Sequence, residues 1–419
     1  MTERKSLSPI VLYRRYRKLS LGTKILIFMV IGIVAGIVFG ERTTVVQPLG
    51  DLFIRLLMMA AFPLIFFNLL AGMTSLSDVR RLGRISLKIL VYFFLTTAAA
   101  MILGIVLMSV LKPGVGMQLT GRVEKDIGEI PKIADIFLNL VPENIFESFS
   151  SGQIIQVVVF AVLLGVAAIR LPNKYREPLQ KIFDVLARLF RQLVIVLMYF
   201  GPIGIGALMA STIGQYGTAV FGPLAVFIGG VYGVIVLMIM IYLVLLSLLA
   251  RKSPLVFLKE TAPLYATTVA TCSSLASLTV GLEVAEERVK LPRSIYSFTL
   301  PLGAQLNKDG TAAMLAAVFV FTTQASGIEF SLASQVTVVL FGILLTTGVG
   351  GIPGGGIVMA LIFVKAFQLP PEIAVIIGGI YRLIDMGITT SNIMGDMVGT
   401  VIVSHSENRR GQATFYRGN

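Results

Sequence analysis

The sequence predicts an all-α polytopic membrane protein, and two observations support this fold class. Of the 419 residues, 56% are hydrophobic and only 14% are charged, which gives a mean hydropathy of +0.87. A soluble chain of this length carries far more charge. Long apolar runs also alternate with short clusters of basic residues, as spanning helices do with their cytoplasmic loops.

The basic residues predict the orientation in the membrane. The net charge is +13, but the cations cluster at 14–18, 80–84 and 409–410. This is the positive-inside pattern and not a nucleic-acid-binding stripe. We therefore expect no nucleic acid partner, a lipid bilayer of the plasma membrane (a prokaryotic inner membrane) and cytoplasmic N- and C-termini. We expect no removable signal peptide, because no small-residue cleavage site follows the first basic run.

The first two thirds of the chain are predicted to form ordinary spans. Apolar runs cover 25–40, 56–76, 89–111 and 154–169. Every residue between Arg191 and Arg251 is uncharged, which leaves room for two spans at about 1.5 Å per residue. Glycines and a proline at 201–202 and 214–217 supply the turn. The only long polar loop, 113–131, is expected outside the membrane.

Two segments of the last third look like re-entrant hairpins. Segment 261–282 has no charge, yet eight of its residues are Ser or Thr, clustered in "TTVATCSSLAS". The 35 uncharged residues of 330–364 would make a helix of about 52 Å, too long for a hydrocarbon core of about 30 Å. The run "GVGGIPGGG" (348–356) would fold them back into two arms. The alternative is an ordinary loop between two short spans.

Two interrupted helices are expected at membrane depth, one of them with its break in 301–311, and the last segment, 378–403, is expected to be an apolar helix that carries charges. Irregular backbone survives there only when it is buried in protein or lines a watery cavity. Two hairpins with polar tips and two interrupted helices are the sequence pattern of a secondary transporter.

Charged residues in these segments mark a candidate site. A charge at the bilayer centre costs about 2.5–3.5 kcal/mol. Asp385, Asn392 and Asp396 fall within about 40° on one helix face, and residues 307–309 are their expected partners. Carboxylates, amides and half-helix dipoles suit a zwitterion and small hard cations. The alternative is a buried cluster that Lys308 neutralises.

At these residues the chain resembles a known family. "NKDGT" (307–311), the Gly/Pro hairpin and "DMGITTSNIMGD" (385–396) are similar to the glutamate transporter homologues, the dicarboxylate/amino acid:cation symporters. The similarity extends over nearly the whole chain, including 49–66 and 295–304. It implies a homotrimer whose protomers have eight transmembrane helices plus two re-entrant helical hairpins, inverted repeats and an elevator-type mechanism.

The resemblance also implies a division into domains. Residues 1–80 would be N-terminal scaffold helices and 81–112 a third helix in the transport domain. Residues 113–252 would hold the trimerisation helices and the start of the transport domain. Its core would be 253–404, with hairpin 1, broken helix 7, hairpin 2 and helix 8, and 405–419 would be a cytoplasmic tail.

The resemblance implies which residues bind the substrate and the cations. Asp385 would bind the substrate amino group and Asn392 its carboxylate, and the rest of the cradle would be Ser274, Thr311, Ile352 and Gly354. One Na⁺ would be held by Asp396, Asn307 and carbonyls near Gly303 and Asn392. A second would be held by Asp309, Asn307, Thr96 and Thr97. A third would use backbone around Thr346, Thr347 and Val349.

The pocket departs from the family in three places. Ile388 stands where members with acidic substrates carry an arginine, Tyr381 where many carry an aspartate, and Cys272 where others place an arginine. An unpartnered buried carboxylate is costly. We therefore hypothesise a neutral, apolar amino acid as substrate, with an acidic amino acid or a dicarboxylate of the same family as the alternative. Arg382 lies near this face, and we interpret it as structural.

Lys308 is a further departure, because the family has methionine there. Its ammonium could take the place of one Na⁺ or exchange a proton. Coupling would then depend less on Na⁺, with H⁺ replacing it partly or wholly. The alternative is a lysine that only pairs with a neighbouring aspartate.

Other function classes fit less well. The chain is not expected to be an enzyme: an intramembrane aspartyl protease needs Gly-x-Gly-Asp and Tyr-Asp, and only "IMGD" (393–396) is present. One cysteine and one histidine, Cys272 and His405, exclude an internal disulfide and disfavour a zinc site. An ion channel would need more polar faces on the early helices.

Overall fold

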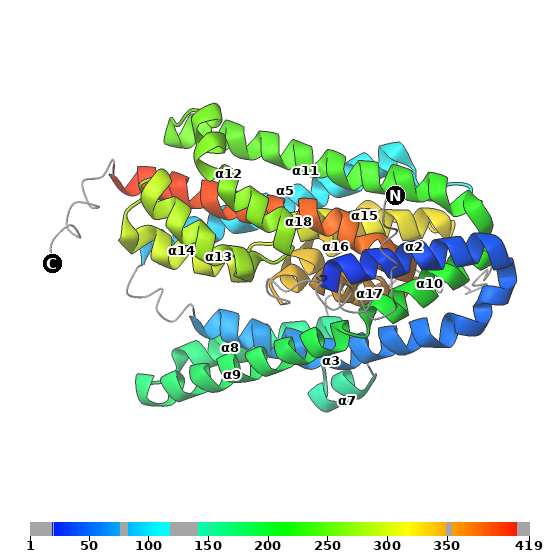
Figure 1. The fold of residues 1–419 in the computed structure, drawn as a ribbon. Helices are drawn as coiled ribbons and strands as arrows, with labels where there is room; N and C mark the ends of the chain where they lie inside the picture. Colours follow the sequence, from blue (N-terminus) through cyan, green and yellow to red (C-terminus); the bar gives the residue numbers. More distant parts are fainter. Residues whose placement is uncertain are drawn as a thin grey trace, which may run out of the picture.

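The computed structural model describes residues 19, 21–75, 83–117, 141–151, 153–348 and 354–408. These residues are helical throughout and contain no strand (Figure 1). The elements are α2 (Leu21–Phe39), η1 (Gly40–Val46), α3 (Gln47–Ser75), α5 (Arg84–Leu111), α7 (Ile145–Ser151), α8 (Ile154–Arg170), α9 (Asn173–Met198), α10 (Gly201–Tyr216), η3 (Gly217–Val220), α11 (Phe221–Ala250), α12 (Pro254–Thr271), α13 (Ser274–Glu283), η4 (Val284–Arg288), α14 (Arg293–Leu306), α15 (Asp309–Ala325), α16 (Leu332–Thr346), α17 (Gly355–Ala366) and α18 (Glu372–Asn408).

Among the described residues, four stretches are long and apolar enough to cross a membrane: Leu21–Thr74, Arg84–Leu111, Gly201–Ala250 and Ile373–Asn408. The first contains the turn η1, from which α2 and α3 run in opposite directions (Figure 1). The third contains η3 between α10 and α11. Several apolar helices are thus confirmed. Of the predicted polar loop 113–131, only 113–117 lie within the described residues.

The helices pack in two groups. Helices α2, α3, α8, α9 and α10 pack chiefly on one another, whereas α5 and α11 pack on α15 and α18. Gly32 of α2 allows the closest approach in the first group, since a Cβ there would lie 2.2 Å from the Gly206 carbonyl oxygen of α10. Small residues let helix backbones approach in this way. The groups meet where α18 contacts α2 and α10 and where α17 contacts α3.

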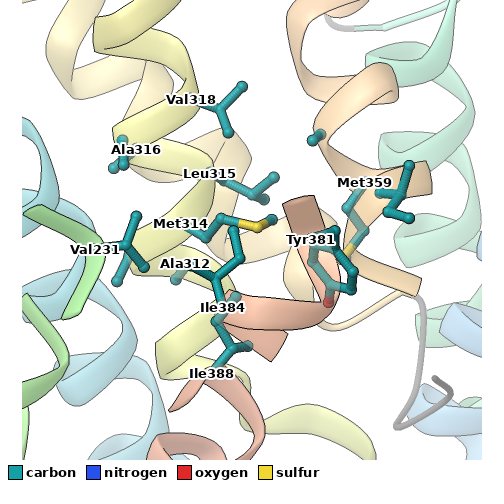
Figure 2. Packing of buried hydrophobic residues seen from close by; sticks show 14 of the residues in the cluster. Val231, Ala312, Met314, Leu315, Ala316, Val318, Met359, Tyr381, Ile384 and Ile388 are labelled. Atoms are coloured by element: carbon teal, nitrogen blue, oxygen red, sulfur yellow. The ribbon is translucent and has the colours of Figure 1, made fainter. Parts of the chain in front are cut away.

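The second group is built around α15, which is buried from Asp309 to Thr323. Figure 2 shows Met314 and Leu315 of α15 beside Ile384 and Ile388 of α18, with Tyr381 between α15 and α17. The polar residues at the start of α15 therefore lie deep inside the protein.

The break predicted in 301–311 is present, and the charged segment 378–403 is helical as predicted. Between α14 and α15, Asn307 is extended (φ −86°, ψ 116°) and Lys308 is also non-helical (φ −138°, ψ 50°). By contrast, α18 is one continuous helix of 37 residues. It contains no proline, and the Thr400 hydroxyl bonds the Asp396 carbonyl one turn earlier. The second interrupted helix that the sequence led us to expect is therefore not α18.

Two helical hairpins approach the middle of α18 from opposite ends of the bundle (Figure 1). In the first, Cys272 takes a left-handed conformation (φ 49°) after α12, and the Ser273 hydroxyl caps α13 by accepting from the Ala276 N–H at 3.2 Å. In the second, α16 and α17 pack against each other. Its tip, 349–353, lies outside the described residues.

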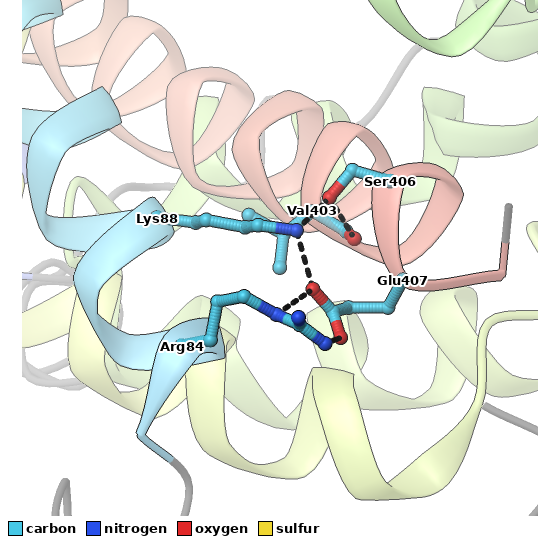
Figure 3. A network of polar contacts seen from close by, with 5 residues as sticks. All are labelled: Arg84, Lys88, Val403, Ser406 and Glu407. Atoms are coloured by element: carbon cyan, nitrogen blue, oxygen red, sulfur yellow. Dashed lines mark hydrogen bonds and ion pairs between the residues drawn. The ribbon is translucent and has the colours of Figure 1, made fainter. Parts of the chain in front are cut away.

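A cluster of charges joins the start of α5 to the end of α18 (Figure 3). Arg84 donates to both carboxylate oxygens of Glu407, at 3.2 and 3.0 Å. Lys88 donates to Glu407 and, at 2.6 Å, to the Ser406 hydroxyl. Bidentate arginine–carboxylate pairs are strong and geometrically specific. The cluster therefore fixes α5 to α18, two helices that are far apart in the sequence.

Candidate functional site

Asp385 is a buried carboxylate at the middle of α18, 4% exposed. Its Oδ1 accepts from the Tyr381 hydroxyl at 2.9 Å and from the Thr389 hydroxyl at 3.3 Å. These residues stand one turn before and one turn after it, so they share its helix face. The Gly354 N–H approaches the same carboxylate from the second hairpin, and Cys272 lies nearby in the first. Both hairpins thus reach Asp385.

Asn392, two turns further along α18, contacts the start of α15. Its Oδ1 accepts from the Gly310 N–H at 2.8 Å, and its Nδ2 donates to the Thr311 hydroxyl at 3.4 Å. N–H groups in the first turn of a helix have no partner within the helix, so the amide satisfies one of them. A Cβ at Gly310 would lie 2.5 Å from the Ile388 carbonyl oxygen, which explains the glycine.

Asp309 is fully buried where α5, α11 and α15 meet. Its Oδ1 accepts from Thr97 and its Oδ2 from Tyr242, both at 2.6 Å. Thr96 and Asn307 also approach the carboxylate. This set offers only oxygen ligands from hydroxyl, amide and carboxylate groups, which are the ligands of hard cations.

Asp396 lies beside this set and is only partly satisfied. Its Oδ1 accepts from Asn307 Nδ2 at 3.0 Å, and its carboxylate packs so closely on Gly303 that a Cβ there would lie 2.4 Å from Oδ1. Within the part of the chain that the structure describes, its buried Oδ2 has no hydrogen-bond partner. A free buried carboxylate oxygen next to an amide and helix-end carbonyls fits a Na⁺ ligand set.

Lys308 is buried in the break between α14 and α15, 3% exposed. Its ammonium donates to the Ala304 carbonyl at 2.5 Å, and the carboxylates of Asp396 and Asp309 are the opposing charges around it. It makes no direct ion pair with another described residue. Lys308 and Asp396 still interact electrostatically without direct contact, so the alternative of a lysine that pairs with a neighbouring aspartate stays a prediction.

The remaining predicted residues lie at the hairpin tips or in the apolar core. Cys272 and Ser274 are buried at the first tip, and Ile388 is buried in the apolar cluster of Figure 2. At the end of α16, the hydroxyls of Thr346 and Thr347 bond carbonyls of their own helix, at 2.9 and 2.7 Å. Two predicted positions, Ile352 and Val349, lie outside the described residues.

Arg382 contacts the first hairpin and α2. Its Nη2 donates to the Ala270 carbonyl at 3.1 Å, and a Cβ on Gly22 would lie 2.6 Å from its Nε. These contacts agree with a structural role. Its Nε, however, has no hydrogen-bond partner among the residues described, and its charge acts on Asp385.

Sequence reasoning missed several polar contacts of the site. Tyr242 lies in a strongly apolar run, and the only available signal was that a buried tyrosine hydroxyl usually needs a partner. Thr389 could have been found from its spacing of four residues after Asp385. Asn68, whose Oδ1 accepts from Arg191 at 3.1 Å and from Gln305 at 3.3 Å, joins the two helix groups near Lys308.

The profile of the sodium:dicarboxylate symporter family matches residues 21–406, which include every described helix of the site. The chain belongs to this family. The resemblance inferred from "NKDGT" and "DMGITTSNIMGD" is thereby confirmed. The sodium:dicarboxylate symporter family consists of transporters, so its members act by translocation and not by catalysis of a covalent reaction.

Three relatives illustrate the range of the sodium:dicarboxylate symporters. A proton/glutamate-aspartate symporter of Bacillus subtilis is 31% identical over 391 residues, covering 92% of this chain and 94% of the relative. A proton/sodium-glutamate symport protein of Geobacillus stearothermophilus is 29% identical, covering 93% and 95%. A C4-dicarboxylate transport protein of Rhizobium johnstonii is 32% identical, covering 90% and 86%.

Proposed function

We propose that this chain is a cation-coupled symporter of an acidic amino acid, glutamate or aspartate. Full-length similarity to relatives named for these substrates favours an acidic solute over the neutral one expected from the pocket. The observation that carries the proposal is Asp385, a buried carboxylate reached by both hairpins. A buried carboxylate binds an ammonium group well, which favours an amino acid over a C4-dicarboxylate.

In this proposal Asp385 binds the substrate amino group and Asn392 its α-carboxylate, with Thr311 beside it. The Asn392 amide donates only a long hydrogen bond, 3.4 Å, to Thr311, so a carboxylate could replace that acceptor. For the side-chain carboxylate the candidate cation is Arg382, whose charge acts on Asp385 and whose Nε has no hydrogen-bond partner in the described chain.

A neutral amino acid is the second candidate, and Ile388 favours it. This side chain is 1% exposed and packs with Ile384, on the helix face that begins with Tyr381 (Figure 2). This face offers no cationic side chain to pair with the side-chain carboxylate of an acidic substrate. The substrate side chain would then pack on Ile388, as hypothesised from the sequence.

Cation coupling would use two adjoining sets of oxygen ligands. Na⁺ would bind to them together with the solute and would supply positive charge. Asp309, Thr97 and Asn307 would form one set, and Asp396 with the backbone near Gly303 the other. A third set at Thr346 and Thr347 stays a prediction. The Lys308 ammonium beside Asp396 would replace part of the Na⁺ requirement, with H⁺ coupling as the complement.

The larger architecture is part of the same proposal. We propose eight transmembrane helices plus two re-entrant hairpins, arranged as inverted repeats, in a homotrimer with both termini in the cytoplasm. The group of α2, α3, α8, α9 and α10 would be the scaffold. The group around α15 and α18 would move against it like an elevator. The separate packing of the two groups supports this division.

Uptake into proteoliposomes tests the proposal. The full-length protein should concentrate aspartate or glutamate above a panel of neutral amino acids and succinate, in a manner that saturates. Asp385→Asn should lower uptake at least about tenfold, the factor for one lost charge-assisted hydrogen bond. Thr389→Val is the matched control, because it removes only the 3.3 Å donor to the same oxygen.

Arg382→Gln separates the two candidates. If Arg382 binds the side-chain carboxylate, this variant loses acidic substrates and keeps neutral ones. Preference of the wild type for a neutral amino acid, with no change in Arg382→Gln, would reject the acidic proposal and support the neutral one. Linear, unsaturable flux would reject both in favour of a channel.

A further inference from the structure

The proposed function assigns Asp385 to the substrate amino group but gives no role to the hydrogen bond that Tyr381 donates to it. Tyr381 is buried one turn before Asp385 and donates to Oδ1 at 2.9 Å. A phenolic oxygen that donates its proton can still accept a hydrogen bond. Tyr381 is therefore equipped to link Asp385 to a third group.

That third group is the first turn of α17, in the second hairpin. A Cβ on Gly356 would lie 2.3 Å from the Tyr381 hydroxyl oxygen, and the Gly356 N–H approaches the same oxygen. Gly354, in a left-handed conformation (φ 77°), brings its N–H towards Asp385. The first N–H groups of a helix lack partners, and a carboxylate there is favourable. Asp385 and Tyr381 together cap α17.

We propose that Tyr381 is a latch that holds the second hairpin closed on Asp385. The inference rests on the proposed role of Asp385 as the site of the substrate amino group. An ammonium group that reaches Asp385 then competes with Tyr381 for the same oxygen. Closure of the hairpin also becomes possible without a solute, because groups of the chain itself make the contact. Tyr381 is a positioning residue, since it acts through Asp385 and α17.

The only cysteine of the chain provides a test that needs no known substrate. Cys272 is 1% exposed and lies at the tip of the first hairpin, near Asp385. In the purified full-length protein without added solute, modification of Cys272 by a small water-soluble thiol reagent should report opening of the hairpins. Tyr381→Phe should accelerate it about tenfold or more, the factor for one hydrogen bond to a charged group.

Thr389→Val is the control. It removes another α18 hydroxyl that donates to the same oxygen, but it leaves the contact between Tyr381 and α17 intact. The latch predicts little acceleration in this variant. An unchanged rate in Tyr381→Phe, or equal acceleration in both variants, would overturn the proposal.

Gly356→Ala provides a second, independent variant. Its added Cβ would separate α17 from the Tyr381 hydroxyl without removing either hydrogen-bonding group. It should accelerate the labelling of Cys272 as Tyr381→Phe does. The double variant should be no faster than the faster single one, since both break one contact. Independent, multiplicative acceleration would contradict a shared latch.

Transport supplies the last readout. In the proposed elevator cycle, net uptake includes a return step without bound solute, whereas solute exchange does not, so closure of the hairpin without solute matters for net uptake alone. Tyr381→Phe should therefore slow net uptake severalfold more than exchange, and equal slowing of both would count against the latch. If the wild type carries no tested amino acid, the proposed function fails, but the labelling result still decides whether Tyr381 holds the hairpin.

Discussion

Tyr242 of α11 donates a 2.6 Å hydrogen bond to Asp309 Oδ2, at the start of α15. Because Thr97 of α5 occupies the other carboxylate oxygen, three helices meet at one fully buried charge. A charge in such a place is tolerated only when its oxygens are satisfied by hydrogen bonds or by a cation.

Tyr242→Phe should therefore lower the melting temperature in Na⁺-free buffer, by the equivalent of about 1–3 kcal/mol for an unsatisfied buried acceptor. Added Na⁺ should recover part of the loss, because the freed oxygen becomes available to a cation. Differential scanning fluorimetry with and without Na⁺ measures both effects. Tyr232→Phe on the same helix is the control: its hydroxyl bonds the Leu383 carbonyl at 2.6 Å, so its response to Na⁺ should match the wild type. Equal responses in the two variants would contradict a cation at Asp309.

Gly303→Ala should displace the Asp396 carboxylate, since the new Cβ would lie 2.4 Å from Oδ1. We expect a loss of Na⁺-dependent stabilisation and of uptake, at least about tenfold if one charge-assisted contact is lost. Gly229→Ala in α11 is the matched control: nothing lies within 4 Å of its Cβ, and alanine favours helix over glycine. Wild-type Na⁺ dependence in Gly303→Ala would show that Asp396 is not needed for coupling.

Lys308→Met should make transport depend more steeply on Na⁺. The variant removes the ammonium beside Asp396, so positive charge would have to come from solution. Uptake measured as a function of Na⁺ concentration should fall at low Na⁺ and approach the wild type at high Na⁺. Lys259→Met, at an exposed position of α12, should leave the curve unchanged. Identical curves for Lys308→Met and the wild type would assign the lysine a purely structural role.

Glu407→Gln should loosen the contact between α5 and α18. The substitution keeps the shape but removes the charge that Arg84 and Lys88 share, and we expect a loss of about 1–3 kcal/mol. Asp184→Asn, which breaks the exposed 2.9 Å pair with Arg188, should cost at most about 1 kcal/mol. Melting temperatures of both variants in low salt provide the comparison. A larger loss of stability in Asp184→Asn than in Glu407→Gln would contradict a stabilising role for the Glu407 cluster.

Periodicity and charge predicted much of the site because both act locally. Asp385, Asn392 and Asp396 were placed on one face by helical spacing, and α18 is helical throughout, so the spacing holds. The break at Asn307 and Lys308 followed from polar residues between apolar flanks. No local pattern predicted Tyr242, because its partner is 67 residues away.

The glycines of α18 are contact points with neighbouring helices. Gly379 lies where a Cβ would meet Met209 Sδ at 2.1 Å, and Gly387 where it would meet the Tyr232 ring at 2.7 Å. Packing by neighbouring helices, which the sequence does not display, keeps these glycines within regular helix.

Because α18 is unbroken, it connects Asp385 rigidly to Asp396. Asp385 and Asp396 are eleven residues apart, about 16 Å along a single rod. A displacement of one carboxylate along the bundle axis must displace the other by the same amount, unless the rod bends. A solute bound at Asp385 and a cation bound at Asp396 would then move together, because the stiff backbone of α18 links the two carboxylates directly.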